Sequence, residues 1–446
     1  MVEDSAIIIL GASGDLAQRK LMPALRTLYE QNQISGECLI VGSGRTPFSD
    51  DEFRDRFKLP PECTVRLFYH QHIAGLKKFL DGKGQFRQII IFFSLPPGTY
   101  LDSAIAVHNE GFRENVRLII EKPFGRDHSS ARELNRKLEE LFGEESIFRI
   151  DHYLAKEVVQ NILVFRFANN LFYPVWNSRH IESIQINALE EIGVVERGRY
   201  FDEVGIVKDM VQNHLLQLLL LLTMEAPITL KPEDIRTQKI NLLKSLQFEE
   251  CATGQYSGYR RESGIPPDST TETFAELRAT INNFRWTGMP IHIRVGKALH
   301  RSGTEIGVRF HPVPKLLFNE TGQLKPNQII FKVQPEAGIL LDLSSKKPGS
   351  DMLITETSME FCYRKSFDGE IPEAYQKLLL DALKGDHTLF VSAEETELAW
   401  NKIESLRLPD QPFSYEPGSR PPAVLPVSWI EFDKYISACA DVGRGF

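Results

Sequence analysis

The 446-residue sequence contains few cysteines, and their arrangement argues against two classes of small scaffold. The five cysteines, an odd number, are scattered along the chain and form no C-x-x-C pair. Zinc ribbons need closely spaced thiol pairs, and disulfide frameworks are typical of small secreted domains. We therefore expect a reduced, cytoplasmic protein with neither a zinc ribbon nor a disulfide framework.

The sequence also lacks a surplus of positive charge, since its formal net charge is −8. A chain of this charge is unsuited to nucleic acid or to an anionic membrane surface as its main partner. An anionic small molecule would therefore need a local basic pocket.

Long hydrophobic runs are absent as well. The most apolar segment, residues 215–222, is far shorter than the ~20 residues that a membrane-spanning helix needs. The first residues are acidic and precede an apolar run only one strand long, so we expect no signal peptide. We predict that residues 205–223 form a buried helix.

Short, mainly apolar segments alternate with helical patterns in the first third of the chain. The predicted strands are residues 6–10, 38–41, 65–69, 89–93 and 116–120. Fully apolar strands separated by helices indicate a parallel sheet covered on both faces. Ligands of such sheets bind at the carboxyl ends of the strands.

The remainder of the chain has a different pattern. The predicted strands are residues 180–188, 274–281, 291–295, 305–310, 328–334 and 353–363, with helices at 371–383 and 393–403. Few helices separate the later strands, which favours a mostly antiparallel sheet. We predict an α/β dinucleotide-binding domain at residues 1–150 and a larger α+β domain at 151–446, ending in an irregular arm at 409–426.

A glycine turn follows the first predicted strand with the spacing G-x-x-G-x-x-A. Gly11 allows a tight turn, Gly14 allows a pyrophosphate to approach the backbone, and Ala17 allows close contact between helix and strand. The second strand ends without a carboxylate and is followed by Arg45, which can pair with a 2′-phosphate. These features favour NADP over NAD, with NAD left as the alternative.

Three further segments carry groups suited to catalysis. In Arg149-Ile-Asp-His-Tyr-Leu-Ala-Lys-Glu157, a helix would place His152 and Lys156 on one face, as a phosphorylated ligand requires. Lys122 follows an apolar strand and precedes Pro123, where a cis bond would fix the turn. His214 lies in a polar cluster of an otherwise apolar helix and can accept the proton of an alcohol being oxidised.

Several motifs together resemble the glucose-6-phosphate dehydrogenase family. They are GASGDLAQRKL from Gly11, EKPFGRD from Glu121, RIDHYLAKE from Arg149, RYFDEVGIVKDMVQNH ending at His214, and VGKAL around Lys297. The resemblance implies a Rossmann domain followed by a large antiparallel-sheet domain. It implies oxidation of glucose 6-phosphate at C1 to 6-phosphogluconolactone with reduction of NADP, the first step of the oxidative pentose phosphate pathway. It also implies a homodimer or homotetramer.

The resemblance also assigns roles to individual residues. His214 matches the general base, Asp151 the carboxylate that orients it, and Lys122 a lysine shared by substrate and cofactor. Positions matching the substrate site are His152, Tyr153 and Lys156 for the phosphate, and Glu190, Asp209, Lys297 and Gln334 for the sugar. Positions matching the coenzyme site are Gly11, Ala12, Ser13, Gly14, Asp15, Leu16, Arg45, Tyr100 and Lys122. We expect no metal ion in the site.

The sequence departs from the family pattern near the predicted cofactor and substrate sites. The stretch 45–65 is short, and Gly42-Ser43-Gly44 replaces bulkier residues before Arg45. Ser302 stands where a second basic substrate contact is expected, so either Arg301 substitutes for it or the contact is lost. Two alternatives remain: the same fold with a preference for NAD or another hexose 6-phosphate, and a non-catalytic regulator that binds NADP or a sugar phosphate.

Overall fold

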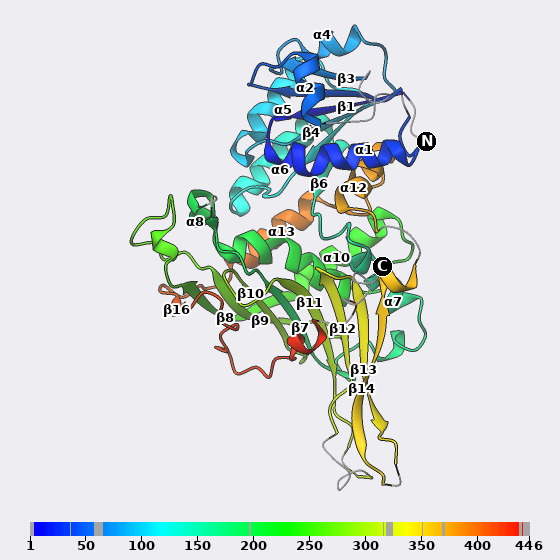
Figure 1. The fold of residues 1–446 in the computed structure, drawn as a ribbon, viewed down its shortest axis with the longest axis vertical. Coiled ribbons are helices and arrows are strands. Elements are labelled where there is room, and N and C mark those ends of the chain that lie inside the picture. The colour runs from blue at the N-terminus through cyan, green and yellow to red at the C-terminus, as the bar shows by residue number, and fades with distance from the viewer. Residues whose placement is uncertain are drawn as a thin grey trace. The chain divides into compact units, whose positions relative to one another are not determined.

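The computed structural model describes residues 4–35, 37–57, 66–195, 198–314, 316–317, 324–349, 351–367, 371–436 and 439. The chain divides into two compact units (Figure 1). Unit 1 comprises Met1–Ala155, Pro227–Ile240 and Pro372–Trp400, and unit 2 comprises Lys156–Ala226, Asn241–Ile371 and Asn401–Phe446. Among the described residues, no helix is both long enough and apolar enough to cross a membrane.

Unit 1 is built on a seven-stranded sheet with the order β15-β6-β5-β4-β1-β2-β3. Its strands are β1 (Ser5–Leu10), β2 (Leu39–Gly44), β3 (Leu67–Gln71), β4 (Gln88–Phe93), β5 (Val116–Ile120), β6 (Ile147–Ile150) and β15 (Phe390–Val391). All neighbours pair in parallel except β15, which pairs antiparallel to β6. The order reverses at β1, so β1 and β4 form the switch point at which such sheets bind ligands.

Helices on the connections bury the apolar strands of this sheet. They are η1 (Ala17–Leu21), α1 (Met22–Glu30), α2 (Asp50–Phe57), α4 (Leu76–Asp81), η2 (Pro97–Thr99), α5 (Tyr100–Asn109), α6 (His128–Phe142), η3 (Glu144–Ser146) and α12 (Ala374–Lys384). α6 begins where the Asp127 carboxylate accepts a hydrogen bond from the Ser130 amide at 2.7 Å. This cap satisfies an amide that has no partner within the helix.

Two late segments of the chain belong to unit 1, whereas the sequence analysis placed everything after residue 150 in the second domain. Arg117 on β5 donates to the carbonyls of Ala382 and Leu383 at the end of α12. The Trp400 indole N–H donates to the Phe124 carbonyl at 2.9 Å. These contacts span more than 260 residues of sequence, so local patterns could not reveal them. α10 (Pro232–Ser245) and α13 (Ala393–Glu404) each run from unit 1 into unit 2.

Unit 2 is built on a nine-stranded sheet with the order β14-β13-β12-β11-β7-β10-β9-β8-β16. Its strands are β7 (Ile181–Leu189), β8 (Leu246–Tyr256), β9 (Phe274–Ile281), β10 (Ile291–Gly296), β11 (Gly303–Phe310), β12 (Gln328–Gln334), β13 (Gly338–Lys346), β14 (Ile354–Cys362) and β16 (Phe413–Tyr415). Only the β7–β10 and β8–β16 pairs among these strands are parallel. A parallel-sheet domain followed by a mostly antiparallel one confirms the predicted fold class.

The helices of unit 2 include the predicted buried helix, which is less regular than expected. They are α7 (Glu157–Phe167), η4 (Tyr173–Val175), α8 (Gly198–Ile206), η6 (Val207–Leu215), α9 (Leu216–Thr223), η7 (Tyr259–Arg261), α11 (Tyr363–Ser366) and η8 (Phe432–Tyr435). η6 is a π-helix that follows Gly205, whose φ is +72°. Arg166 of α7 is buried and donates to the carbonyls of Leu221 and Met224, which lie at the end of α9.

The C-terminal segment is fastened to unit 2 in two ways. Ile430, Phe432 and Tyr435 pack against apolar side chains of β12 and β13. Cys439 forms a disulfide with Cys362 at the end of β14. The expectation of a reduced protein was therefore wrong at these two cysteines, because a pairing across 77 residues leaves no signature in cysteine spacing.

Candidate active site

The glycine turn after β1 has the geometry that its spacing predicts. Gly11 has a φ of +81°, and a Cβ at this position would lie 2.0 Å from the Ser94 carbonyl oxygen. Its amide donates to the Ser43 carbonyl at 2.7 Å, which holds the turn across the ends of β1, β2 and β4. Ala17 is completely buried where η1 begins. Only glycine fits at position 11, and the backbone near Gly14 stays open to a pyrophosphate.

The glycines that precede Arg45 are explained by aromatic packing. A Cβ on Gly42 would lie 2.0 Å from the Phe53 ring, and one on Gly44 would lie 3.1 Å from the Tyr69 hydroxyl. Phe53 is completely buried, and its ring lies 5.0 Å from that of Tyr69. The unusual Gly-Ser-Gly sequence therefore makes room for rings from α2 and β3. The Arg45 side chain is exposed beyond it.

Lys122 and Tyr100 lie at the carboxyl ends of β5 and β4. The Lys122–Pro123 peptide bond is cis, as predicted. Tyr100 is buried against Phe93, with 1% of its surface exposed, at the start of α5. Both positions are therefore at the edge of the sheet where the glycine turn lies.

Glu121, immediately before Lys122, is a functional candidate that sequence reasoning treated only as a neighbour of the lysine. Its carboxylate accepts a hydrogen bond from the Tyr375 hydroxyl at 2.9 Å. Burial raises the pKa of Glu121 to about 7, against the lowering effects of Tyr375 and Lys122. A carboxyl directly after a mainly apolar strand, at the ligand-binding edge, was the signal available in the sequence.

The segment after β6 is a turn, and the prediction that a helix places His152 and Lys156 on one face was wrong. The Asp151 carboxylate accepts a hydrogen bond from the Tyr153 amide at 3.0 Å, and the Asp151 carbonyl accepts one from Leu154. Lys156 occupies the N-cap position of α7. Because an Asp side chain bonds the backbone two residues on, it stabilises a turn in competition with a helix.

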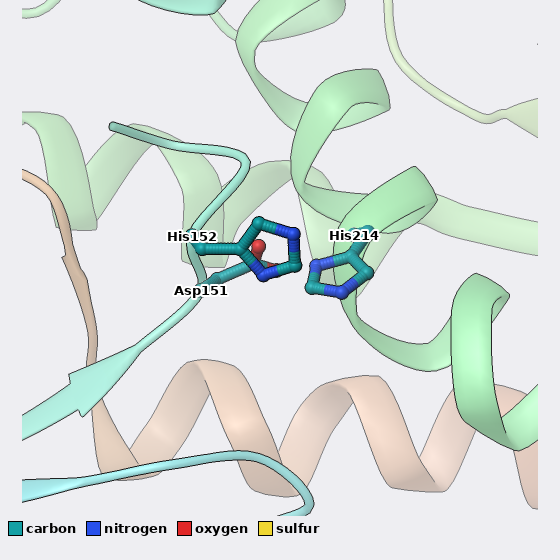
Figure 2. A group of neighbouring side chains, drawn as sticks. All are labelled: Asp151, His152 and His214. Atoms are coloured by element: carbon teal, nitrogen blue, oxygen red, sulfur yellow. The ribbon is translucent and has the colours of Figure 1, made fainter. Parts of the chain in front are cut away.

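Figure 2 draws the two elements that carry the candidate acid–base residues. Asp151 and His152 are consecutive in the turn after β6, whereas His214 is carried by η6. His214 has 1% of its surface exposed, and its amide donates to the Asn213 side-chain oxygen at 2.7 Å. Asp209 lies on the same helix. π-Helical segments are rare and frequently occur at functional sites, so the irregular helix supports a functional position for this histidine.

Four of the predicted sugar and phosphate residues form two pairs within unit 2. Lys156 donates a hydrogen bond to the Gln334 side-chain oxygen, and Lys297 forms an ion pair with Glu190. The partners in these pairs are separated by 178 and 107 residues. The sheet therefore gathers polar side chains that the sequence analysis could assign only through the family resemblance.

Arg301 forms ion pairs with carboxylates within unit 2. Its guanidinium pairs with both Asp433 and Glu305, and its side chain is 12% exposed. The Ser302 hydroxyl accepts a hydrogen bond from the Glu191 amide at 2.8 Å. Of the two alternatives for the second basic contact, this arrangement favours loss of the contact over substitution by Arg301.

Comparison with known proteins gives the same family for both parts of the chain. Residues 8–62 and 63–161 match the glucose-6-phosphate dehydrogenase NAD binding domain, and residues 163–429 match the C-terminal domain of that family. Glucose-6-phosphate 1-dehydrogenase from Dictyostelium discoideum is 38% identical over 93% of this chain and 92% of its own length. The Bacillus subtilis enzyme of that name is 37% identical over 90% and 91%.

Solved structures agree with this result. A glucose-6-phosphate dehydrogenase in complex with glucose 6-phosphate covers 100% of this chain and 98% of its own, at 34% identity and a TM-score of 0.88. The glucose-6-phosphate 1-dehydrogenase of Mycobacterium avium covers 94% and 95%, at 31% identity and a TM-score of 0.83. The chain, with its nicotinamide dinucleotide-binding domain and its antiparallel-sheet domain, belongs to the glucose-6-phosphate dehydrogenase family.

Proposed function

We propose that this protein oxidises C1 of glucose 6-phosphate to 6-phosphogluconolactone and transfers the hydride to NADP. The observation that carries the proposal is the family match over both units, together with a buried His214 on the π-helix. The product feeds the oxidative pentose phosphate pathway in the family that this chain resembles. A cytoplasmic location and a homodimer or homotetramer are part of the same proposal.

The residues fit the cofactor, because Gly14 carries no side chain where a pyrophosphate must approach, and the only neighbour of a Cβ there among the described residues would be the Gly11 carbonyl oxygen at 3.2 Å. NADP, when bound, supplies the hydride acceptor. We assign Gly11, Ala12, Ser13, Gly14, Asp15, Leu16, Arg45, Tyr100 and Lys122 to the coenzyme site. The exposed guanidinium of Arg45 can pair with a 2′-phosphate through two parallel hydrogen bonds.

Substrate binding and proton transfer fall to the other site residues. His214 takes the proton of the C1 hydroxyl as the hydride leaves, and Asp151 is the carboxylate that we assign to orient the imidazole. We assign Lys122 to both substrate and cofactor, and the sugar phosphate to His152, Tyr153 and Lys156. The residues assigned to hold sugar hydroxyls or to lie close to the substrate are Glu190, Asp209, Lys297 and Gln334. The Lys156–Gln334 and Lys297–Glu190 pairs support this assignment, because each orients a flexible ammonium group.

Initial rates with glucose 6-phosphate and either NADP or NAD test the proposal. A higher kcat/KM with NADP is the expected result. A preference for NAD would keep the reaction and overturn the cofactor assignment. Absence of turnover with both cofactors, together with tight binding of NADP or glucose 6-phosphate, would favour the non-catalytic regulator.

A further inference from the structure

Two arginines at the carboxyl edge of the parallel sheet have no carboxylate partner among the described residues. They are Arg45, after β2, and Arg56, near the end of α2, and both are exposed. Arg54, on the same helix as Arg56, instead pairs with Asp51 and donates to the Leu67 carbonyl. Within a chain of net charge −8, uncompensated cations at a ligand-binding edge indicate an anionic ligand.

Contacts of Arg56 place it beside the phosphate-binding turn. Its guanidinium lies 5.0 Å from the centre of the Phe48 ring and reaches the side-chain amide of Gln18. The backbone amide of Gln18 donates to the Gly14 carbonyl at 3.2 Å, so Gln18 lies one helical turn beyond the second glycine. Arg56 therefore spans from α2 to the first turn of the helix that follows β1.

The loop that carries Arg45 is held against the same ring. The Tyr69 hydroxyl donates to the Thr46 carbonyl at 2.5 Å, and the Tyr69 ring packs edge-on against Phe48 at 5.2 Å. Phe48 thus contacts both the Arg56 guanidinium and the tyrosine ring that holds the backbone of Thr46. Both arginines consequently border the end of β2, where this type of fold places the ribose of the adenosine half.

We propose that Arg56 is a second specificity residue for NADP, which binds the 2′-phosphate together with Arg45. The inference rests on the proposed use of NADP and adds a residue that the sequence motifs do not assign. The Phe48 ring lies near the guanidinium, and Gln18 contacts two of its nitrogens, which leaves the remaining N–H donors for phosphate oxygens. Two cations around one phosphate discriminate against NAD, which has a hydroxyl there.

Binding of adenosine 2′,5′-bisphosphate and of 5′-AMP, measured by calorimetry on the full chain without sugar phosphate, tests the proposal. Arg56→Gln is expected to weaken binding of the bisphosphate by tenfold or more and to leave 5′-AMP binding unchanged. Arg56→Lys keeps the charge but loses the paired N–H donors of the guanidinium. Its affinity for the bisphosphate should therefore lie between those of wild type and Arg56→Gln. In turnover, kcat/KM should fall for NADP and stay constant for NAD.

Arg54→Gln is the matched control, because it removes a cation from the same helix that already has a carboxylate partner. It should leave the ratio of the two affinities unchanged. Equal losses of both ligands in Arg56→Gln, or no loss of either, would overturn the role of Arg56. If the wild type binds the bisphosphate no more tightly than 5′-AMP, the NADP proposal itself fails, and this outcome is distinct from a failure of Arg56.

Discussion

Glu121 is a carboxyl group that makes stability depend on pH. Its folded-state pKa is raised to about 7 from an ordinary value of 4.5, chiefly by burial. Between about pH 4.5 and 7 the folded state keeps a proton that the unfolded chain has lost. Stability from this group therefore falls as pH rises through that window and is constant above it.

We predict that Glu121→Gln removes this pH dependence. The Tm of wild type minus that of the variant should be larger at pH 5 than at pH 8, as measured by differential scanning fluorimetry. The difference in Tm between the two proteins is used because other buried groups also titrate and contribute equally to both. Tyr375→Phe should move the window to higher pH, because the tyrosine hydroxyl stabilises the ionised carboxyl. Parallel profiles for wild type and Glu121→Gln would contradict the assignment.

His214 is the residue on which the proposed chemistry depends most. His214→Asn should lower kcat by about 10²–10⁴-fold, the usual contribution of a general base, with little change in KM for glucose 6-phosphate. Steady-state kinetics measures both. The exposed His180, replaced in the same way, serves as the control and should remain fully active. An active His214→Asn enzyme would exclude this histidine as the base.

Lys156 should act in binding and much less in the chemical step. Lys156→Ala removes a charged contact to the phosphate, so KM for glucose 6-phosphate should rise about tenfold or more, with KM for NADP unchanged. Gln334→Ala should also raise this KM, because it frees the ammonium that Gln334 orients and removes a side chain assigned to the sugar site. Lys325→Ala, at an exposed lysine outside the assigned sites, is the control and should leave KM for glucose 6-phosphate unchanged. An unchanged KM in Lys156→Ala would remove this lysine from the phosphate site.

At the scale of elements, the sequence predicted two strands well because one face of each is continuously apolar. β9 and β12 begin and end at the predicted residues, because alternate side chains line one apolar face of each strand and only one register buries that face. β8 and β13 were missed, since each carries polar side chains along an exposed half of its length. Their existence depends on neighbouring strands, which a local pattern does not contain.

The candidate site could be predicted in its residue types but not in its pairings. The glycine turn at Gly11 followed from spacing alone, because its requirement is a backbone conformation. The Glu121–Tyr375 bond joins residues 254 apart, and the turn at Asp151 competes with a helix that the sequence also permits. Burial and long-range packing decide both, and neither is encoded within a short window.

The disulfide joins the C-terminal segment to the edge strand β14. Cys362→Ser is expected to destabilise the protein, by up to about 4.5 kcal/mol in the chain-entropy description of a long loop. Chemical denaturation with and without reductant measures this effect, and reduced wild type should resemble the variant. Cys251→Ser is the control, because Cys251 is a free thiol. Equal stability of the oxidised and reduced proteins would show that packing of the C-terminal segment suffices.

At the scale of the whole molecule, the candidate cofactor and sugar residues belong largely to different units. Gly11, Arg45 and Lys122 belong to unit 1, whereas Lys156, Lys297 and Gln334 belong to unit 2. A ligand that binds only the folded state stabilises it by about 2.7 kcal/mol at one hundred times its Kd. NADP and glucose 6-phosphate should therefore each raise the Tm of the wild type in a concentration-dependent manner.

Single variants should remove one of these stabilisations and keep the other. Arg45→Gln should reduce the Tm increase caused by NADP and leave that caused by glucose 6-phosphate, and Lys156→Ala should do the reverse. Calorimetry of both variants with each ligand at fixed concentration gives the four values required. Loss of both increases in either variant would mean that the residue supports the fold, because a binding contact affects only its own ligand. If a variant keeps both Tm increases, its substituted residue lies outside the ligand sites. The four values therefore distinguish a loss of binding from a loss of folding in each unit.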